Sequence, residues 1–243
     1  MPVQFRIQNG PPRAISPLIG CLPLFVAFAL MCLLPMFLYD TARTAFERLG
    51  LSPGMAGVAI LGIVMGSVIN YPVYRIEKDE LQPQSSFGPL GMSLQRTYQR
   101  VQSSTVIAVN VGGCVIPVAL AALQVVHLAR HGTEQLLMAF AVAAISIAVC
   151  WRVARPMEGI GILIPGFVPP LVSVLVTWLL LSQATPEQRA ATAFIAGVTG
   201  PLIGADLLHL KEMTKTPVAM VSIGGAGTFD GIVLSGILAA LLA

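Results

Sequence analysis

Seven apolar runs of about 20 residues are the feature of this sequence that most limits its possible folds. A helix needs about 20 apolar residues to cross the roughly 30 Å of hydrocarbon in a bilayer. Only 10% of the residues are charged and the mean hydropathy is +0.82, whereas about a quarter of a soluble domain is charged. We therefore expect an all-α membrane protein with about seven transmembrane helices. The expected spans are roughly 18–39, 54–73, 105–129, 135–153, 159–182, 190–210 and 218–243.

The connections between these runs predict the domain organisation. Residues 1–17 are expected to form a cytoplasmic N-terminal tail, and residues 18–243 a single polytopic transmembrane domain. The one long connection, at about 74–104, is rich in turn residues and is expected to be a cytoplasmic loop. Ten Lys and Arg residues lie in the N-terminal tail and in the connections on the same side of the membrane. Four lie in the connections on the opposite side. Because cytoplasmic loops carry the excess of Lys and Arg, we expect the N-terminus in the cytoplasm and the C-terminus outside.

The charge balance and the metal-binding residue types exclude several function classes. Fourteen Lys and Arg residues stand against 11 Asp and Glu residues, so no basic face for a nucleic-acid partner is predicted. The four Cys residues all fall within apolar runs, which is typical of packing residues. His127, His131 and His209 lack further ligands at zinc-like spacing, so we expect no metal site. Nothing in the sequence indicates a particular cofactor.

Two aspartates within apolar runs are the strongest candidates for chemistry. A charge at the centre of a membrane helix costs about 2.5 to 3.5 kcal/mol on insertion scales, so its presence needs a reason. Asp206 lies in GPLIGADLLHL and Asp230 in SIGGAGTFDGI. Glycines four residues apart, such as Gly200 with Gly204, let helices approach closely. Helix packing can therefore explain these glycines, but it does not explain the two carboxylates.

The glycines around Asp230 predict that the last span is broken. Four glycines fall within eight residues: Gly224, Gly225, Gly227 and Gly231. Each costs about 1 kcal/mol relative to Ala inside a helix. If regular helix begins only near Thr228, the 16 remaining residues extend about 24 Å, which is less than a full crossing. We therefore expect residues 222–227 to be irregular and the chain to end in a half-helix or discontinuous helix.

An ion, proton or substrate site is predicted around this break. Thr228 or Asp230 would lie at the positive end of the half-helix, where free N–H groups can hold an anion or a substrate oxygen. Asn110, beside two glycines, is typical of a kinked helix with freed backbone groups, whereas Asn70 is expected at the membrane interface. The predicted site residues are Asp206, Asp230, Thr228, Asn110, Gly224, Gly225 and Gly227.

Four sequence segments also carry a resemblance to a known family. They are VNVGGCVIPV at 109–118, GIGILIPGFVPPLV at 159–172, GPLIGADLLHL at 200–210 and SIGGAGTFDGIVLSGILAALLA at 222–243. Together they resemble the uncharacterised prokaryotic membrane family known as domain-of-unknown-function family 1614. The resemblance implies a multi-pass protein of the cytoplasmic (inner) membrane. It implies no activity and no role for any residue.

Three classes of function remain open on the sequence. A small transporter or channel-like protein with a buried acidic site explains both the broken spans and the two aspartates. An intramembrane aspartyl-protease-like hydrolase would use the same aspartates, but Ala205 rather than Gly precedes Asp206 and the accompanying motifs are absent. A non-catalytic assembly or scaffold subunit needs the aspartates only for structure. The expected partners are the lipid bilayer and either further copies of the chain or another membrane subunit.

Overall fold

A computed structural model describes residues 17–87, 93–157, 161–213, 219–225 and 231–243. Most of these residues are helical, as expected. Five strands also occur in these ranges, so the prediction of an all-α protein is wrong in this respect. Of the predicted N-terminal tail, residues 1–16 lie outside the described residues.

Four helical segments are long and apolar enough to cross a membrane, judged by their length and composition. They are Leu24–Arg48, Val111–His131, Thr133–Val153 and Pro186–Leu207. Three further apolar helices in the described part of the chain are shorter: Pro53–Gly66, Val168–Leu180 and Gly231–Leu242. Each expected span thus contains an apolar helix, and the helices support a membrane protein. Seven full crossings are not confirmed, because three of the helices are too short for the hydrocarbon core.

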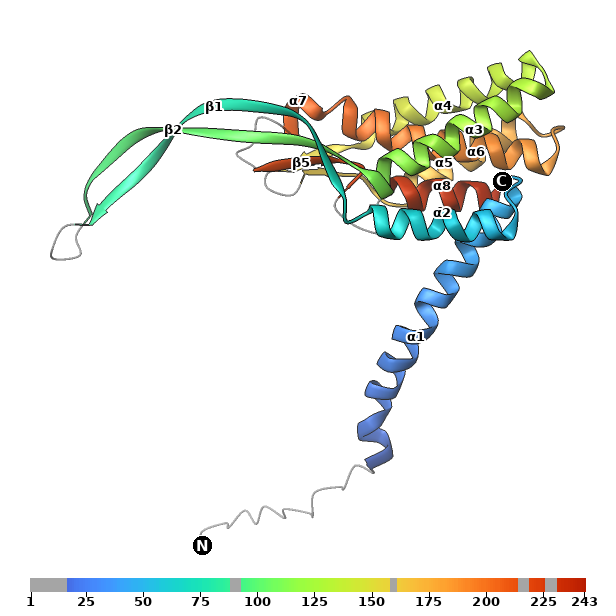
Figure 1. Cartoon of the computed structure of the whole chain (residues 1–243), viewed down its shortest axis with the longest axis horizontal. Helices are drawn as coiled ribbons and strands as arrows, with labels where there is room; N and C mark the ends of the chain where they lie inside the picture. Colours follow the sequence, from blue (N-terminus) through green and yellow to red (C-terminus); the bar gives the residue numbers. More distant parts are fainter. Residues whose placement is uncertain (1–16, 88–92, 158–160, 214–218, 226–230) are drawn as a thin grey trace, which may run out of the picture. The chain divides into compact units, whose positions relative to one another are not determined.

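The chain divides by its contacts into two compact units, Met1–Asp40 and Thr41–Ala243. Helix α1 (Pro17–Arg48) contributes to both. In the second unit, six further helices of 12 to 21 residues lie side by side as a bundle (Figure 1). They are α2 (Pro53–Gly66), α3 (Ile116–His131), α4 (Thr133–Val153), α5 (Val168–Leu180), α6 (Pro186–Thr199) and α8 (Gly231–Leu242).

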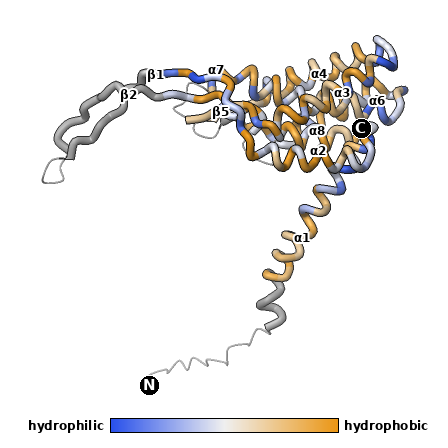
Figure 2. The backbone as a smooth tube through the Cα atoms, in the orientation of Figure 1, coloured by the Kyte–Doolittle hydropathy of each residue, from blue (hydrophilic) through white to orange (hydrophobic). Residues whose placement is uncertain are grey.

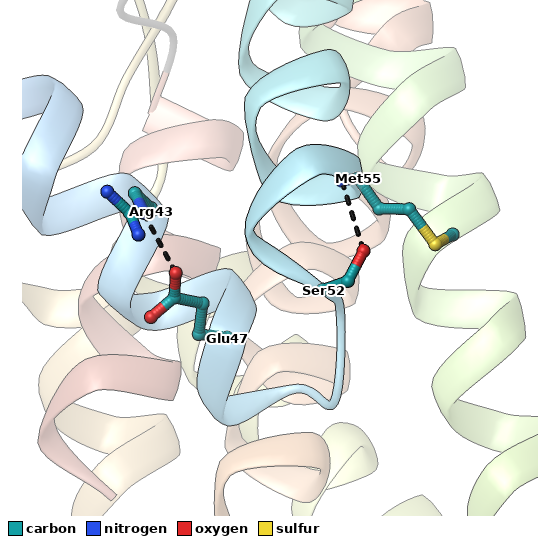
Figure 3. Close-up of polar contacts among 4 residues, drawn as sticks. All are labelled: Arg43, Glu47, Ser52 and Met55. Atoms are coloured by element: carbon teal, nitrogen blue, oxygen red, sulfur yellow. Dashed lines mark hydrogen bonds and ion pairs between the residues drawn. The ribbon is translucent and has the colours of Figure 1, made fainter.

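Local sequence signals set the starts of several helices. Ser52 precedes α2, and its hydroxyl accepts a hydrogen bond from the Met55 backbone N–H (Figure 3). Proline follows directly at the first position of α2, where its missing N–H costs nothing. Figure 3 also shows the ion pair between Arg43 and Glu47 near the end of α1. Arg43 Nε and Glu47 Oε1 are 2.8 Å apart. Thr185 starts α6 in the same way, with a reciprocal capping box to Gln188.

The bundle is held together by small residues and a few large ones. Phe46 and Phe194 meet edge to face with their ring centroids 6.3 Å apart. A Cβ on Gly197 of α6 would lie 2.9 Å from the Cβ of Ala239 in α8, so these two helices are in close contact. Many large apolar side chains of the helices are exposed. Figure 2 shows that most residues along the helices are hydrophobic. A bilayer would cover this surface.

A three-stranded sheet lies at one end of the bundle (Figure 1). Strands β1 (Asn70–Phe87) and β2 (Ser93–Asn110) pair in antiparallel fashion, and β5 (Met220–Ile223) pairs in parallel with β2. Residues 74–87 and 93–104, expected as a loop, therefore form a β-hairpin. Residues 105–110, expected as the start of a transmembrane helix, belong to strand β2. A second sheet pairs β3 (Arg155–Met157) with β4 (Gly161–Leu163).

The last segment of the chain is discontinuous, as predicted. Strand β5 ends at Ile223, and Gly224 and Gly225 follow with φ of +84° and +72°. Helix α8 has 12 residues and extends about 18 Å. The expected break is thus confirmed over residues 222–225, where the backbone is strand and then left-handed turn. Gly227 lies outside the described residues.

Candidate functional site: a polar junction lined by glycines

Several elements of the second unit end at the same place, next to the three-stranded sheet. They are the end of α2, the start of β1, the passage from β2 into the π-helix η1 (Val111–Val115), the end of the π-helix η2 (Gly200–Leu207), and the end of β5. Hydrogen bonds and close backbone contacts join them. We call this region the glycine junction. It consists of Ser67, Asn70, Asn110, Gly112, Gly113, Asp206, Ser222, Gly224 and Gly225.

Asn110 is the fully buried centre of this junction. Its backbone is extended and its side chain caps η1, because its Oδ1 accepts a hydrogen bond of 2.7 Å from the Gly113 N–H. Its Nδ2 donates to the Ser67 carbonyl at 2.7 Å and to Asn70 Oδ1 at 3.1 Å. One side chain therefore joins the end of α2, the start of β1 and the start of η1.

These contacts fix the orientation of two amides in succession. The Gly113 N–H is a donor and the Ser67 carbonyl is an acceptor, so Asn110 can satisfy both in only one orientation. The NH₂ group of Asn110 then faces Asn70, so Asn70 accepts this hydrogen bond with its amide oxygen. That oxygen also lies 2.7 Å from the hydroxyl of Ser222, which in turn lies 2.9 Å from the Gly225 carbonyl. A hydroxyl has one proton, so Ser222 serves two acceptor oxygens with a single donor.

Asp206 approaches the same region from the end of η2. Its Oδ2 accepts a hydrogen bond of 2.9 Å from the Gly224 N–H. The carboxylate is half-buried, and it is held against the left-handed turn that interrupts the last apolar segment. This contact joins residues 18 positions apart in the chain. Such a hydrogen bond to a charged acceptor stabilises by about 1.5 to 3 kcal/mol.

Glycine backbones fill the space where side chains would otherwise separate the elements. A Cβ on Gly66 of α2 would lie 2.9 Å from the Gly112 nitrogen. A Cβ on Gly113 would collide with the Gly224 carbonyl oxygen, and one on Gly224 would lie 2.6 Å from the Cys114 Cβ. The end of β5 is thus pressed directly against the first turn of η1. No residue larger than glycine fits at these positions without movement of the backbone.

Both π-helices of the described chain border this junction. π-Helices are rare and occur frequently at functional sites. Pro201 accounts for η2, because it has no N–H for the carbonyl four residues earlier and so breaks the α-helical pattern. At the end of η2, the buried ring of His209 has its Nδ1 within 3.1 Å of the Gly204 and Ala205 carbonyls. Because both neighbours are acceptors, Nδ1 carries the proton and stabilises the helix end.

The structure brings together some of the predicted site residues. Asn110, Asp206, Gly224 and Gly225 all belong to the glycine junction. Gly227, Thr228 and Asp230 lie outside the described residues. The interpretation of Asn110 as part of a kinked helix is wrong, because it ends a strand and caps the π-helix that follows.

Sequence reasoning missed Asn70 and Ser222 as side-chain contributors. The side chain of Asn70 bonds to both Asn110 and Ser222. The signal that could have found Asn70 is its pairing with Asn110 in the β1–β2 register. Recognising that register requires the hairpin to be recognised first.

The chemistry of this junction suits a proton or a cation. The carboxylate of Asp206, the amide oxygen of Asn70 and the carbonyl of Gly225 are oxygen ligands of the kind that hard cations prefer. Asn70 Oδ1 also accepts from Asn110 Nδ2, so the single proton of Ser222 leaves neither Asn70 nor the Gly225 carbonyl without a donor. Among the described residues, no group of three or more His, Cys, Asp or Glu could hold a metal ion.

Comparison with known proteins gives one match. The family described as "Protein of unknown function (DUF1614)" matches residues 64–242, which include every residue of the glycine junction. No curated protein and no solved structure matches the chain.

Proposed function

The chain belongs to the DUF1614 family, whose function is unknown, and we propose that it is a small transporter or channel-like membrane protein that moves a proton or small cation. The proposed site is the glycine junction, in which Asp206, Asn70 and Gly225 supply oxygens, while Asn110 and Gly224 hold Asn70 and Asp206 in place. Gly227, Thr228 and Asp230, from the segment between Gly225 and α8, complete the proposed set.

One observation carries this proposal: the Asp206 carboxylate is bonded to the left-handed turn that separates β5 from α8. Transporters build ion and substrate sites from discontinuous helices whose unwound backbone meets a buried acid. Irregular backbone at membrane depth is tolerated only where it is buried in protein or lines a cavity.

The distribution of basic residues supports a proposed orientation. The connections at the junction end of the bundle carry Arg75, Arg152, Arg155 and Lys211, among others. We propose that this end faces the cytoplasm, in the inner membrane. A cation leaving the junction would then enter the cytoplasmic side.

A structural role is the second candidate, and a specific observation favours it. Asn110 uses both amide protons and its oxygen on protein groups, and glycine backbones fill the surrounding space. A scaffold or assembly subunit would need such a junction only to hold its helices and sheet together. The two candidates differ in whether the negative charge of Asp206 is needed.

Ion flux through vesicles containing the full-length chain tests the proposal. Gradients of H⁺, Na⁺ and K⁺ are applied in turn, and entry is followed with fluorescent indicators. Asp206→Asn keeps an oxygen for the Gly224 N–H but removes the charge, so we expect flux to fall at least about tenfold while the unfolding temperature changes little. Glu47→Gln is the control, because Glu47 is an exposed carboxylate paired with Arg43 at the other end of the bundle.

Two results would contradict the proposal. The first is a wild-type protein that conducts none of the three ions. The second is Asp206→Asn protein with wild-type flux, which would favour the structural role.

A further inference from the structure

An open apolar groove of about 590 Å³ lies beside the sheet, separate from the hydrogen bonds of the glycine junction. The sheet side is formed by Val73 and Tyr74 of β1 and Val109 of β2. The facing side is formed by Leu207 and Leu208 at the end of η2 and by the start of helix α7 (Leu210–Met213). Its volume is in the range of ligand-binding pockets, which is about 300 to 1,000 Å³.

The groove begins where a membrane-spanning helix ends. Leu207 is the last residue of the candidate span Pro186–Leu207 and also lines the groove. The apolar surface continues across it, because Val73, Tyr74, Leu207 and Leu208 are all exposed. Tyrosine is enriched at the level of the lipid headgroups. The groove is therefore continuous with the surface that a bilayer would cover, at the depth where acyl chains meet headgroups.

One charge stands at this apolar site. Among the described residues that line the groove, Lys211 is the only charged one, and it lies in α7 just beyond the end of η2. A Lys at the membrane surface attracts anionic lipid with about 1 kcal/mol. An apolar groove lined by one cationic side chain matches a molecule with a long apolar chain and an anionic head.

We propose that this groove binds one acyl chain of an anionic phospholipid, with the lipid phosphate next to the ammonium group of Lys211. The occupant comes from the surrounding leaflet, so no soluble ligand needs to reach a membrane-embedded surface. The bound lipid covers the edge between η2 and the sheet. This proposal does not depend on ion transport through the glycine junction.

Lipid retention by the full-length chain tests the proposal. The protein is purified in detergent, given phosphatidylglycerol or phosphatidylcholine, and examined by native mass spectrometry for bound lipid. We expect wild-type protein to retain one phosphatidylglycerol molecule in preference to phosphatidylcholine. Lys211→Gln should lower that preference about fivefold, since only the headgroup contact is lost. Arg155→Gln is the control, because Arg155 is a basic residue of β3 that does not line the groove.

A second pair of variants tests the apolar part of the site. Val73→Asn places a polar side chain in the groove and should weaken retention of both lipids. Val68→Asn is matched to it, since Val68 is also an exposed valine but does not line the groove. Both positions are at the surface, so the variants should unfold at the wild-type temperature.

Three outcomes would overturn the proposal. One is equal retention of the two lipids by wild-type protein. Another is wild-type retention by both Lys211→Gln and Val73→Asn. The third is full competition by glycerol phosphate, which has the anionic head but no acyl chain.

Discussion

Two segments with closely spaced glycines, GPLIGAD and SIGG, look alike in sequence but serve different purposes in the structure. In GPLIGAD, at 200–206, the glycines lie in the helical element η2. In SIGG, at 222–225, they follow a strand and turn the backbone into the left-handed region. The hydrogen bond from Gly224 N–H to Asp206 joins the two segments.

The glycines of η2 permit close packing against α4. A Cβ on Gly204 would collide with the Ile147 carbonyl oxygen and would lie 2.8 Å from the Cβ of Cys150. One on Gly200 would lie 3.2 Å from the Cys150 sulfur. The interpretation of these glycines as packing residues is therefore confirmed. Gly224 differs, because it combines a crowded neighbourhood with a φ of +84°. A glycine cluster alone does not distinguish these two uses, whereas φ and the neighbours of a Cβ do.

The largest effect is expected from Gly224→Ala. A left-handed residue with a Cβ costs about 1 to 2 kcal/mol, and overpacking adds about 1 to 3 kcal/mol. The sum of about 2 to 5 kcal/mol should lower the unfolding temperature in detergent by about 4 to 20 °C. Gly50→Ala measures the cost of the left-handed backbone alone, since Gly50 has a φ of +82° and nothing lies within 4 Å of an added Cβ. Equal losses in the two variants would show that the approach of Gly224 to Cys114 is not tight.

Asp206→Ala should have the next largest effect, because it breaks the contact between the two segments. The Gly224 N–H loses a charged acceptor, which costs about 1.5 to 3 kcal/mol and about 3 to 12 °C in unfolding temperature. Asp206→Asn should recover most of that loss, since an amide oxygen can still accept. If the two variants unfold at the same temperature, the hydrogen bond contributes little to stability.

The sequence predicted the apolar segments and their mostly helical structure, but not the strands. Hydropathy located all seven segments, because burial in lipid requires apolar residues whatever the backbone does. It could not separate strand from helix in STVIAVN at 104–110 or MVSI at 220–223, since a short apolar run suits either. Val, Ile and Thr in these runs favour strands, and this was the signal available for β2 and β5.

The candidate site was predictable where local chemistry determines it. Four glycines within eight residues cannot form a stable helix interior, so the break before α8 followed from propensity alone. The sequence did not predict that Asp206 bonds to Gly224 at this break, because that contact depends on how η2 ends. The joining of Asn70 to Asn110 and Ser222 depends on the pairing of three strands, which no local pattern specifies.

Gly204→Ala should have a smaller effect than either change at the turn. Overpacking against α4 costs about 1 to 3 kcal/mol, but Ala gains about 1 kcal/mol over Gly in a helix. The net loss should be at most about 2 kcal/mol, measured as the shift in unfolding temperature. Gly54→Ala in α2 has nothing within 4 Å of the added Cβ and should stabilise the protein slightly. A Gly204→Ala protein as stable as Gly54→Ala would mean that η2 and α4 can separate without cost.

The smallest effect is expected from Ser222→Ala, next to the turn. Its single hydroxyl proton is shared between Asn70 Oδ1 and the Gly225 carbonyl, so its removal costs one hydrogen bond, about 0.5 to 1.5 kcal/mol. Ser104→Ala is the control, because that hydroxyl lies in the neighbouring strand and bonds to the exposed Arg75. Its loss should be below about 0.5 kcal/mol. The Ser222→Ala change also removes a hydrogen-bond donor from the Asn70 and Gly225 oxygens. If the junction holds a cation, that cation can replace the lost donor, so the variant should lose less stability in high NaCl or KCl than in low salt. An equal loss at both salt concentrations would limit Ser222 to a structural role.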